Sequence, residues 1–540
     1  MTLSGVLTTQ AATRADSPAL VDVSHTWTYD EAAHRSGQIS ASLIASGVSR
    51  GDRVGVHCAK GADGFLAMHA VVSMGAVAVP LDPSSPPSRL ASICARLGID
   101  VVVSHAPKAT SLAGVHELHP LRVAVGVDLP GAASTVVSSQ DLDGFDPASP
   151  VSVDPSDRAY IITTSGSTGE PKGIVHTHAS GVAYAEMTHR TYDMTAADRV
   201  SDIAPHHFDI STHSLWATPM IGATSVVINE AYQRLPASHS QRLQDEAVTI
   251  WYSVPFLLQQ LVLRGDLANR DLSAMRWVKF GGEVISPQII AEMMGHCPNA
   301  RFANAFGPAE VNQCSVAVFD SPPPSDRSVS VGVPVDKTEI LALDPEIETA
   351  SLDDAVATGE RGEMWVHTPQ MMVGYWGAPE MNAAKIQDID GKAFYRSGDL
   401  ISFDEAGEMT FYGRIDHQVK VRGFRIELEG IELALEQLGG SGDGSENVPE
   451  NVPENVIVGV LRAQSGEDEL VAGLLGVSET FDQSEFLRSA ASVLPTYAVP
   501  TRTVILESPM FTGSGKLDRR ALRDRTVEKA NNETVKEDIT

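Results

Sequence analysis

The chain has 540 residues, a length that allows roughly two to four domains with sizeable cores. Apolar residues make up 43% of it and charged residues 20%, which is ordinary for a folded protein and excludes a collagen-like or wholly disordered chain. Its 69 acidic and 40 basic residues give a formal net charge of −29, so we expect neither nucleic acid nor an anionic membrane as a partner.

The cysteines and the N-terminal residues predict a cytoplasmic protein. Cys58, Cys94, Cys297 and Cys314 lie far apart and form no CxxC pair, which argues against a disulfide framework and against a zinc knuckle. The N-terminal segment lacks a basic region followed by an apolar run, and no stretch of about 18 uncharged apolar residues occurs later. We therefore expect a soluble, non-exported protein in a reducing compartment.

From residue 53 to about residue 228, short β-branched runs alternate with Ala-rich stretches of helical character. This alternation is typical of βα units and predicts a layered α/β body. Further apolar runs have the length of buried strands and extend the pattern. The strands expected in this part lie at residues 53–58, 100–104, 160–163, 251–254, 276–280 and 301–303.

After Gly332 the sequence changes to short strands broken by Gly and Pro, with few long helices. This sequence pattern predicts a β-rich subdomain, with strands at residues 362–367 and 408–412. Near Arg414 alternating strand-like positions pass into a helix, and the chain then becomes mixed α and β. We place a domain boundary at Asp416, which gives domains at residues 1–416 and 417–540.

Two segments of the C-terminal domain have compositions that cannot support a core. Residues 439–456 contain a repeated ENVP unit and are rich in turn and charged residues, which predicts a mobile loop without a chemical role. Residues 524–540 are expected to form a solvated, flexible tail.

An apolar strand that begins at Tyr160 opens into a run of Gly, Ser and Thr residues. Glycines let backbone N–H groups turn toward an anion, hydroxyls add donors, and a lysine adds positive charge. The spacing of a Walker loop is absent. The run predicts a polyphosphate cradle, although a flexible surface loop can have the same composition. Its members would be Thr164, Ser165, Gly166, Ser167, Thr168, Gly169 and Lys172.

The segment TSGSTGEPKG resembles the phosphate-loop signature of the acyl-adenylate-forming (ANL) superfamily, which includes acyl-CoA ligases, luciferases and nonribosomal-peptide adenylation domains. The resemblance implies a large multi-layer N-terminal domain, with two α/β subdomains and a β-rich subdomain, and a small α+β C-terminal domain hinged at Asp416. Further segments resemble motifs of this family in the family's order: HHFDIS at 206–211, NAFGPAE at 304–310, YRSGDL at 395–400, GRIDHQVKVRGFRIE at 413–427 and GSGKLDRR at 513–520.

The resemblance also implies a reaction in two halves. A carboxylate attacks the α-phosphorus of ATP to give an acyl-adenylate and pyrophosphate, and a thiol then displaces AMP to form a thioester. Positioning and charge neutralisation would dominate the first half, because negative charge gathers around the phosphorus. By resemblance, Lys516 would bridge the carboxylate and the α-phosphate, and Glu310 with Thr168 would hold Mg²⁺.

The same resemblance assigns residues to the nucleotide. Asp399 would accept both ribose hydroxyls, and Arg414 would lie near the ribose and phosphates, although an ordinary surface ion pair is the alternative. Phe306 would offer a flat face to adenine, with Asn304 near the amino edge and Ala305 in the same group, although Phe306 could equally be core packing.

The chain departs from the family's usual NxYGPTE motif at two positions. It has Phe306 and Ala309 where the family has Tyr and Thr, so two hydroxyls near the nucleotide are lost. Slower adenylation is the expected consequence. A nucleotide-binding relative that no longer turns over stays an alternative.

Asp209 corresponds to the carboxylate with which amino-acid-activating members bind the substrate ammonium. An acyl- or aryl-acid ligase would leave this carboxylate buried and unpaired, so an amino-acid substrate is favoured over that alternative. Asp209 could instead cap the following helix. The family's spacing adds further pocket residues: Ile210, His213, Tyr252, Lys279, Gly281, Ala305, Gln313 and Cys314.

The segments VTIWYSVPFLL and VNQCS resemble those of free-standing enzymes that load proline or β-amino acids onto a separate carrier protein. Because His213 and Gln313 are polar, a β-amino acid or a small polar amino acid is favoured over proline, although His213 could be a wall residue. No segment resembles a carrier domain, so we expect a separate phosphopantetheinylated carrier protein. The sequence therefore predicts an amino-acid:carrier-protein ligase of natural-product biosynthesis, with an acyl- or aryl-CoA ligase as the alternative.

Overall fold

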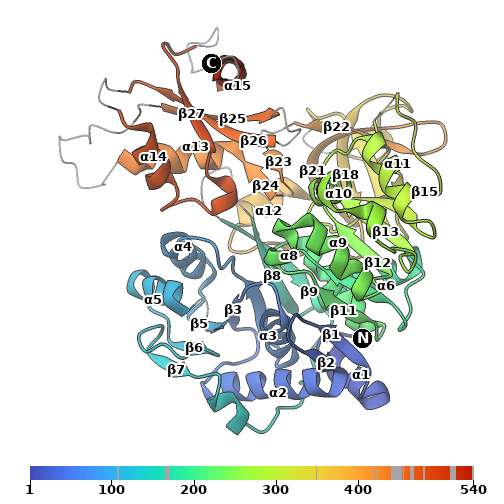
Figure 1. Cartoon of the computed structure of the whole chain (residues 1–540), viewed down its shortest axis with the longest axis vertical. Helices are drawn as coiled ribbons and strands as arrows, with labels where there is room; N and C mark the ends of the chain where they lie inside the picture. The colour runs from blue at the N-terminus through green and yellow to red at the C-terminus, as the bar shows by residue number, and fades with distance from the viewer. Residues whose placement is uncertain are drawn as a thin grey trace. The chain divides into compact units, whose positions relative to one another are not determined.

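The computed structural model describes residues 1–105, 109–164, 171–326, 328–347, 350–415, 418–422, 424–439, 453, 455–462, 468–477, 481–510 and 519–537. The chain forms two compact units (Figure 1). The first comprises Met1–Pro83, Cys94–Thr163 and Gly173–Ile415, and the second comprises Ser84–Ile93, Thr164–Lys172 and Asp416–Thr540. Among the described residues, no helix combines the length and apolarity that crossing a membrane requires.

An eight-stranded sheet forms the N-terminal part of the first unit. Its strands run in the order β19 (Gly374–Tyr375), β9 (Lys172–Thr177), β8 (Arg158–Thr164), β4 (Val77–Pro80), β3 (Arg53–His57), β5 (Val101–Ser104), β6 (Val123–Val125) and β7 (Thr135–Val137). The strands from β4 to β7 pair in parallel. Its central strands are valine-rich and almost wholly buried, as parallel strands covered on both faces must be.

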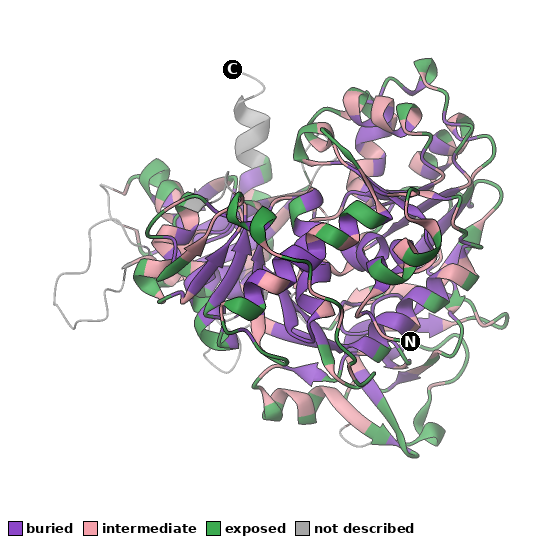
Figure 2. Cartoon of the chain, turned by 90° about the horizontal axis from the view of Figure 1, so that it is seen from below, coloured by how far each residue is buried: buried purple, intermediate pink, exposed green. Residues whose placement is uncertain are grey.

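A nine-stranded sheet forms the second α/β layer of the first unit. Its order is β16 (Val333–Pro334), β15 (Ser315–Phe319), β14 (Arg301–Phe306), β13 (Trp277–Gly281), β12 (Ile250–Ser253), β10 (Arg199–Asp202), β11 (Thr224–Val227), β1 (Pro18–Val21) and β2 (Thr26–Thr28). The strands from β14 through β12, β10 and β11 to β1 are parallel, and the pairs at both edges are antiparallel. Figure 2 shows the strands of the chain mostly as buried.

An antiparallel five-stranded sheet follows in the chain. It consists of β17 (Glu339–Leu343), β18 (Gly362–His367), β21 (Lys392–Phe403), β20 (Ile386–Ile389) and β22 (Met409–Arg414), with β22 paired to β21. All the strands predicted from the sequence are present, with ends shifted by a few residues at most. The predicted α/β class, with two α/β layers and a β-rich part, is therefore confirmed.

Helices cover these sheets. The sequence positions them by ordinary signals: Thr28 and Glu31 form a capping box that starts the second helix. The helices and single turns before residue 416 are α1 (Val6–Arg14), α2 (Tyr29–Ala45), α3 (Ala62–Ser73), α4 (Pro87–Leu97), α5 (Ala109–Leu118), η2 (Asp141–Gly144), α6 (His178–Thr191), η3 (Asp209–Ser211), η4 (His213–Ala217), α7 (Thr218–Met220), α8 (Glu230–Arg234), α9 (Pro236–Asp245), α10 (Pro255–Arg264), η5 (Leu267–Asn269), α11 (Pro287–His296), η6 (Leu352–Asp354) and α12 (Pro379–Lys385).

The second unit has its own core. Its later elements are β23 (Gln418–Val421), β24 (Phe424–Glu427), α13 (Leu428–Glu436), η7 (Gln437–Gly439), β25 (Asn455–Arg462), β26 (Asp468–Leu475), α14 (Gln483–Ala490), η8 (Thr496–Ala498), β27 (Arg502–Ile505) and α15 (Arg519–Glu537). Leu435, Val458 and Phe486 belong to one buried apolar cluster. The functional boundary at Asp416 and the hinge remain predictions.

Two segments differ from the sequence expectation. The helix α15 runs through most of the expected tail at 524–540, and Thr526 and Ala530 are fully buried. Ala530 and Val527 pack into an apolar cluster with strands β25 and β26, which supplies the burial that a solvated tail lacks. The expected loop at 439–456 lies largely outside the described residues, but its end belongs to β25, where Val456 is fully buried.

Several buried histidines predict a specific acid sensitivity. Burial lowers the pKa of His69 and of His239 to about 3, and that of His176 and of His178 to about 4. The unfolded chain takes up protons near pH 6.5, whereas the folded chain keeps these rings neutral. The contribution of these histidines to the free energy of unfolding is therefore fully present above pH 6.5. It is lost as the pH falls from 6.5 toward 4, by up to about 1.4 kcal/mol per pH unit for each histidine.

The urea concentration at the midpoint of unfolding should therefore decrease as the pH is lowered from 7 to 4. The variant His239→Leu removes one of the titrating rings, so its midpoint should fall less steeply with pH than that of the wild-type chain. Parallel curves for the two proteins would contradict the assignment of this ring.

Candidate active site

Asp399 and Arg414 form a paired group on neighbouring antiparallel strands, β21 and β22, where they are register partners. Arg414 Nη1 donates to Asp399 Oδ1 over 2.7 Å, and its Nη2 donates to the carbonyl of Ser397 over 2.9 Å. Asp399 is buried, at 5% exposure, and its backbone N–H donates to Ser397 Oγ. The carboxylate is thus held in a fixed direction by groups of its own sheet, as a two-oxygen acceptor for a pair of hydroxyls must be.

Glu310 is a buried carboxylate held by a tyrosine. Tyr375 donates its hydroxyl to Glu310 Oε1 over 2.8 Å, and the hydroxyl oxygens of Tyr375 and Tyr395 lie 3.3 Å apart. Tyr375 belongs to β19, which pairs with β9, the strand that follows the Gly-rich run. Tyr395 belongs to β21 of the five-stranded sheet, so a tyrosine from each of two sheets contributes to the hydrogen-bonded group at this carboxylate. The sequence interpretation missed both tyrosines, although Tyr395 begins the YRSGDL segment.

The donor set at Glu310 suits a magnesium ion that also binds a nucleotide. Across the described ranges, no cluster of three or more His, Cys, Asp and Glu side chains is arranged to hold a metal. Mg²⁺ commonly takes one or two carboxylates and completes its shell with water and substrate phosphates. Glu310 offers such a hard oxygen.

We expect Glu310→Gln to lower adenylate formation about 100-fold at low Mg²⁺ concentration, because an amide holds a hard cation poorly. The matched variant Tyr375→Phe keeps the carboxylate and removes its hydrogen bond, so it should lose only about 10-fold. The measurement is the rate of adenylate formation as a function of Mg²⁺ concentration. Identical Mg²⁺ dependence for wild type and Glu310→Gln would contradict the role.

Strand β14 carries the residues predicted to contact adenine. Asn304 donates through Nδ2 to the carbonyl of Ser330 over 2.9 Å. Phe306 is half-buried and packs against Phe411, with ring centroids 5.3 Å apart. Gly281 of β13 faces Ala305, and a Cβ there would lie 2.1 Å from the Ala305 carbonyl oxygen. The structure thus shows packing roles for Phe306 and Gly281, and the adenine contact remains a prediction.

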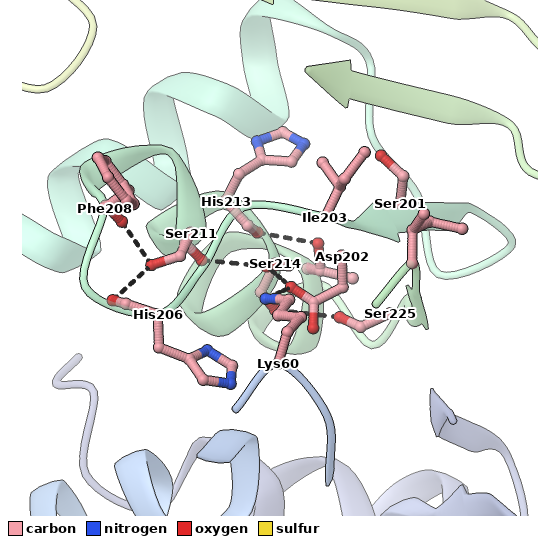
Figure 3. Close-up of polar contacts among 12 residues, drawn as sticks. Lys60, Ser201, Asp202, Ile203, His206, Phe208, Ser211, His213, Ser214 and Ser225 are labelled. Atoms are coloured by element: carbon pink, nitrogen blue, oxygen red, sulfur yellow. Dashed lines mark hydrogen bonds and ion pairs between the residues drawn. The ribbon is translucent and has the colours of Figure 1, made fainter. Parts of the chain in front are cut away.

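A buried polar network fixes the segment that carries Asp209 and His213 (Figure 3). Lys60, which follows β3, forms an ion pair with Asp202 at the end of β10, and both side chains are almost fully buried. Ser214 also donates to Asp202, and Ser225 donates to the Ser214 carbonyl over 3.0 Å. The network ties η3 and the π-helical turn η4 to the strand ends of both α/β layers. The sequence interpretation missed Lys60 and Asp202.

Asp209 is not the N-cap residue of η3 or of η4, since these positions are occupied by Phe208 and Thr212. Neither η3 nor η4 has a side-chain cap hydrogen bond. Burial raises the pKa of Tyr252 and of Tyr184, and the negative charge of Asp209 adds to both shifts. The carboxylate therefore acts on the same group of tyrosines that lines the predicted substrate pocket.

Lys279 lies at the centre of that group. It is fully buried, and its Nζ lies 3.9 Å from the ring centre of Tyr252, 4.4 Å from that of Tyr192 and 5.9 Å from that of Tyr184. Tyr252 and Lys279 are register partners on β12 and β13. Burial lowers the pKa of Lys279 well below its usual value.

His213 and Gln313 reach the same tyrosines. The His213 ring is 5.3 Å from the ring of Tyr252, centre to centre, and Gln313 Nε2 donates to the Tyr192 hydroxyl over 2.8 Å. Burial, with a contribution from Lys279, lowers the pKa of His213 well below its usual value. The structure therefore brings four predicted pocket residues together: His213, Tyr252, Lys279 and Gln313.

Comparison with known proteins identifies the chain. The model of the family described as AMP-binding enzyme matches residues 7–376, more than half of its length. The chain belongs to the AMP-binding enzyme family. The resemblance to the ANL superfamily found in the sequence motifs is thereby confirmed.

Three curated relatives are ligases or synthases by name. The AMP-binding enzyme is 29% identical to L-proline--[L-prolyl-carrier protein] ligase of Pseudomonas fluorescens, with 93% of this chain and 95% of that protein covered. It is 28% identical to phenyloxazoline synthase MbtB of Mycolicibacterium paratuberculosis, over 95% of this chain, and 31% identical to a linear gramicidin synthase polypeptide of Brevibacillus parabrevis, over 94% of this chain. The chain spans only 41% and 6% of the length of these last two proteins.

Solved structures show the same fold. The AMP-binding enzyme superposes on the adenylation domain AlmE of Vibrio cholerae, in complex with glycyl-adenosine-5'-phosphate, with a TM-score of 0.78 at 22% identity over 96% of both chains. It superposes on the amide bond synthetase McbA of Marinactinospora thermotolerans with a TM-score of 0.83 at 20% identity, covering 97% of this chain and 99% of that one.

The remaining predicted residues of the AMP-binding enzyme are placed as follows. Cys314 is buried with its Sγ 3.4 Å from the Phe306 carbonyl oxygen, and Ile210 and Thr164 are half-buried. Within the second unit, Lys172 Nζ lies 3.0 Å from Glu427 Oε1. Outside the described residues lie Ser165, Gly166, Ser167, Thr168, Gly169, Asp416 and Lys516.

Two pocket residues were missed by the sequence interpretation. Tyr184 and Tyr192 come from α6 and the residue just after it, and both are buried. Their sequence neighbours form no recognisable motif, so the signal that identifies them is their contact with Lys279.

Proposed function

We propose that this enzyme activates an amino acid as the aminoacyl-adenylate and transfers it to the phosphopantetheine thiol of a carrier protein, in natural-product biosynthesis. The observation that carries the proposal is Asp209, whose charge acts on the buried tyrosines of the pocket. Asp209 is half-buried, and the ammonium of an amino acid is a cation that can pair with its carboxylate. A carboxylic acid that has no amine would not make this ion pair.

In the first half-reaction, a carboxylate oxygen of the amino acid forms a bond to the α-phosphorus of ATP while the bond to pyrophosphate breaks. Asp399, oriented by Arg414, would hold the ribose hydroxyls. Lys516 would neutralise the charge that both oxyanions bring together. Mg²⁺, when bound through Glu310, would supply further charge neutralisation on the phosphates.

In the second half-reaction, the thiol attacks the carbonyl carbon of the adenylate and AMP leaves with the former carboxylate oxygen. Rotation about Asp416 would remove Lys516 and bring the segment containing Gly423 to the site. The prolyl-carrier-protein ligase that matches nearly its full length supports a carrier protein as the thiol donor.

The test is exchange of labelled pyrophosphate into ATP, measured across a panel of α- and β-amino acids with their deaminated analogues as matched controls. We expect exchange with at least one amino acid and a much slower, though measurable, exchange with its deaminated analogue. Exchange with carboxylic acids that lack an amine, together with AMP release on addition of free CoA, would instead support an acyl-CoA ligase. Tight ATP binding without exchange on any acid would overturn the proposal.

A further inference from the structure

Lys279 is a buried amine that makes no hydrogen bond within the described part of the chain. Among the lysines in the described part of the chain, Lys279 is the one whose buried Nζ has no hydrogen-bond partner. The comparison with Lys60 is direct, because Lys60 is also buried but forms an ion pair with Asp202. A buried ammonium is normally paired, since desolvation strongly disfavours an isolated charge.

The tyrosines around Lys279 do not supply this pairing. They present ring faces to the nitrogen, at 3.9 Å for Tyr252 and 4.4 Å for Tyr192, and the hydroxyl of Tyr192 is already bonded to Gln313. Ring faces attract a cation but do not replace the three hydrogen-bond acceptors that an ammonium uses. The ring faces therefore leave the N–H donors of the Lys279 amine available.

His213 supplies a second unsatisfied donor beside the same rings. It is buried, and neither of its ring nitrogens has a hydrogen-bond partner among the described residues. A neutral imidazole donates one N–H, so His213 and Lys279 each contribute a donor beside the ring of Tyr252. A carboxylate is an acceptor at both oxygens and can satisfy both side chains at once.

The tyrosines of the predicted pocket are also influenced by one acidic and one basic residue, Asp209 and Lys279. Asp209 acts electrostatically on Tyr252 and Tyr184, while Lys279 lies over the ring of Tyr252. The ring of Tyr252 therefore contacts Lys279 and also experiences the charge of Asp209. An amino acid with an aliphatic side chain could pair with Asp209 but would leave the hydrogen-bond donors of Lys279 unsatisfied.

We propose that Lys279, assisted by His213, binds a second carboxylate on the side chain of the substrate, so that the enzyme activates a dicarboxylic amino acid. The inference rests on the proposed function and names its substrate class. One carboxylate reacts with ATP, the ammonium pairs with Asp209, and the other carboxylate pairs with Lys279. Proline and small uncharged amino acids are thereby excluded as preferred substrates.

The first test compares each acid with its isosteric amide in pyrophosphate exchange: aspartate with asparagine, glutamate with glutamine, and a β-amino dicarboxylic acid with its monoamide. We expect kcat/KM for one acid to exceed that of its amide at least about 100-fold, because only the carboxylate brings a negative charge that can pair with a protonated Lys279. In Lys279→Met, a variant of similar side-chain length, this ratio should fall below about 10-fold. The control Lys392→Met changes an exposed lysine and should keep the wild-type ratio.

The outcomes separate the two proposals. Exchange that favours an uncharged amino acid and is unchanged in Lys279→Met would overturn this inference and leave the proposed function intact. Absence of exchange with every amino acid would overturn the proposed function itself.

A second test needs no turnover and also reports whether the variant folds. The dicarboxylic acid should raise the thermal midpoint of the wild-type enzyme, since a ligand that binds the folded state stabilises it. It should leave the midpoint of Lys279→Met unchanged, and the matching amide should have no effect on either protein. An equal rise in wild type and variant would show that the carboxylate is bound elsewhere and would overturn the inference.

Discussion

Replacing Lys516 by Ala should lower the rate of adenylate formation about 10³-fold, while the affinity for ATP should change less than about 10-fold. The physical reason is that a single ammonium would neutralise two oxyanions as they approach, a stabilisation that exists mainly in the transition state. ATP in the ground state has other contacts, such as those proposed for Asp399 and Arg414.

Single-turnover formation of the adenylate and equilibrium titration with ATP measure these two quantities separately. Lys529→Ala is the matched control, since Lys529 is a lysine of α15 in the same unit, bonded to the Ile505 carbonyl. A further control is thioester formation from synthetic aminoacyl-adenylate, which Lys516→Ala should retain. Equal losses in adenylation and in ATP affinity would contradict the assigned role.

The second large effect is expected at Asp209. Asp209→Asn keeps the shape of the side chain and removes its charge, so kcat/KM for the amino acid should fall about 10²- to 10³-fold. The substrate ammonium would then be buried without its counter-ion, which costs several kcal/mol. The deaminated analogue brings no ammonium and should lose nothing in the variant.

The measurement is exchange kinetics for the two acids with both proteins. A parallel loss for the amino acid and for its deaminated analogue would show that Asp209 acts on the loop rather than on the ammonium. Lys60, Asp202 and Ser214 hold that loop, so the substitution could lower activity by disturbing the loop instead of by removing the counter-ion. The comparison of the two substrates distinguishes these explanations.

Much of the fold could be predicted from local patterns in the sequence. The valine-rich runs of β3 and β5 are short, apolar on both faces and separated by helical stretches, and these features are visible without tertiary information. The helix α15 was missed because its polar composition resembles a solvated tail, and only its contacts with the sheet of the second unit bury Thr526 and Ala530.

The candidate site likewise contains residues that the sequence could predict and residues that it could not. Asp399 and Arg414 stand in recognisable segments, and the structure pairs them as register partners, while their contact with the nucleotide stays a prediction. The cage around Lys279 could not be predicted, because its tyrosines come from α6, from the residue after it and from β12, which meet only in the folded chain. The pairing of Lys60 with Asp202 likewise joins residues 142 positions apart.

The most direct measurement of the central claim follows one oxygen atom. An amino acid labelled with oxygen-18 in its carboxylate is incubated with enzyme, ATP and a phosphopantetheinylated carrier protein, and the products are analysed by mass spectrometry. If the carboxylate attacks the α-phosphorus, AMP will carry one labelled oxygen and pyrophosphate none. Label in inorganic phosphate or pyrophosphate, or unlabelled AMP alongside thioester product, would contradict adenylate formation.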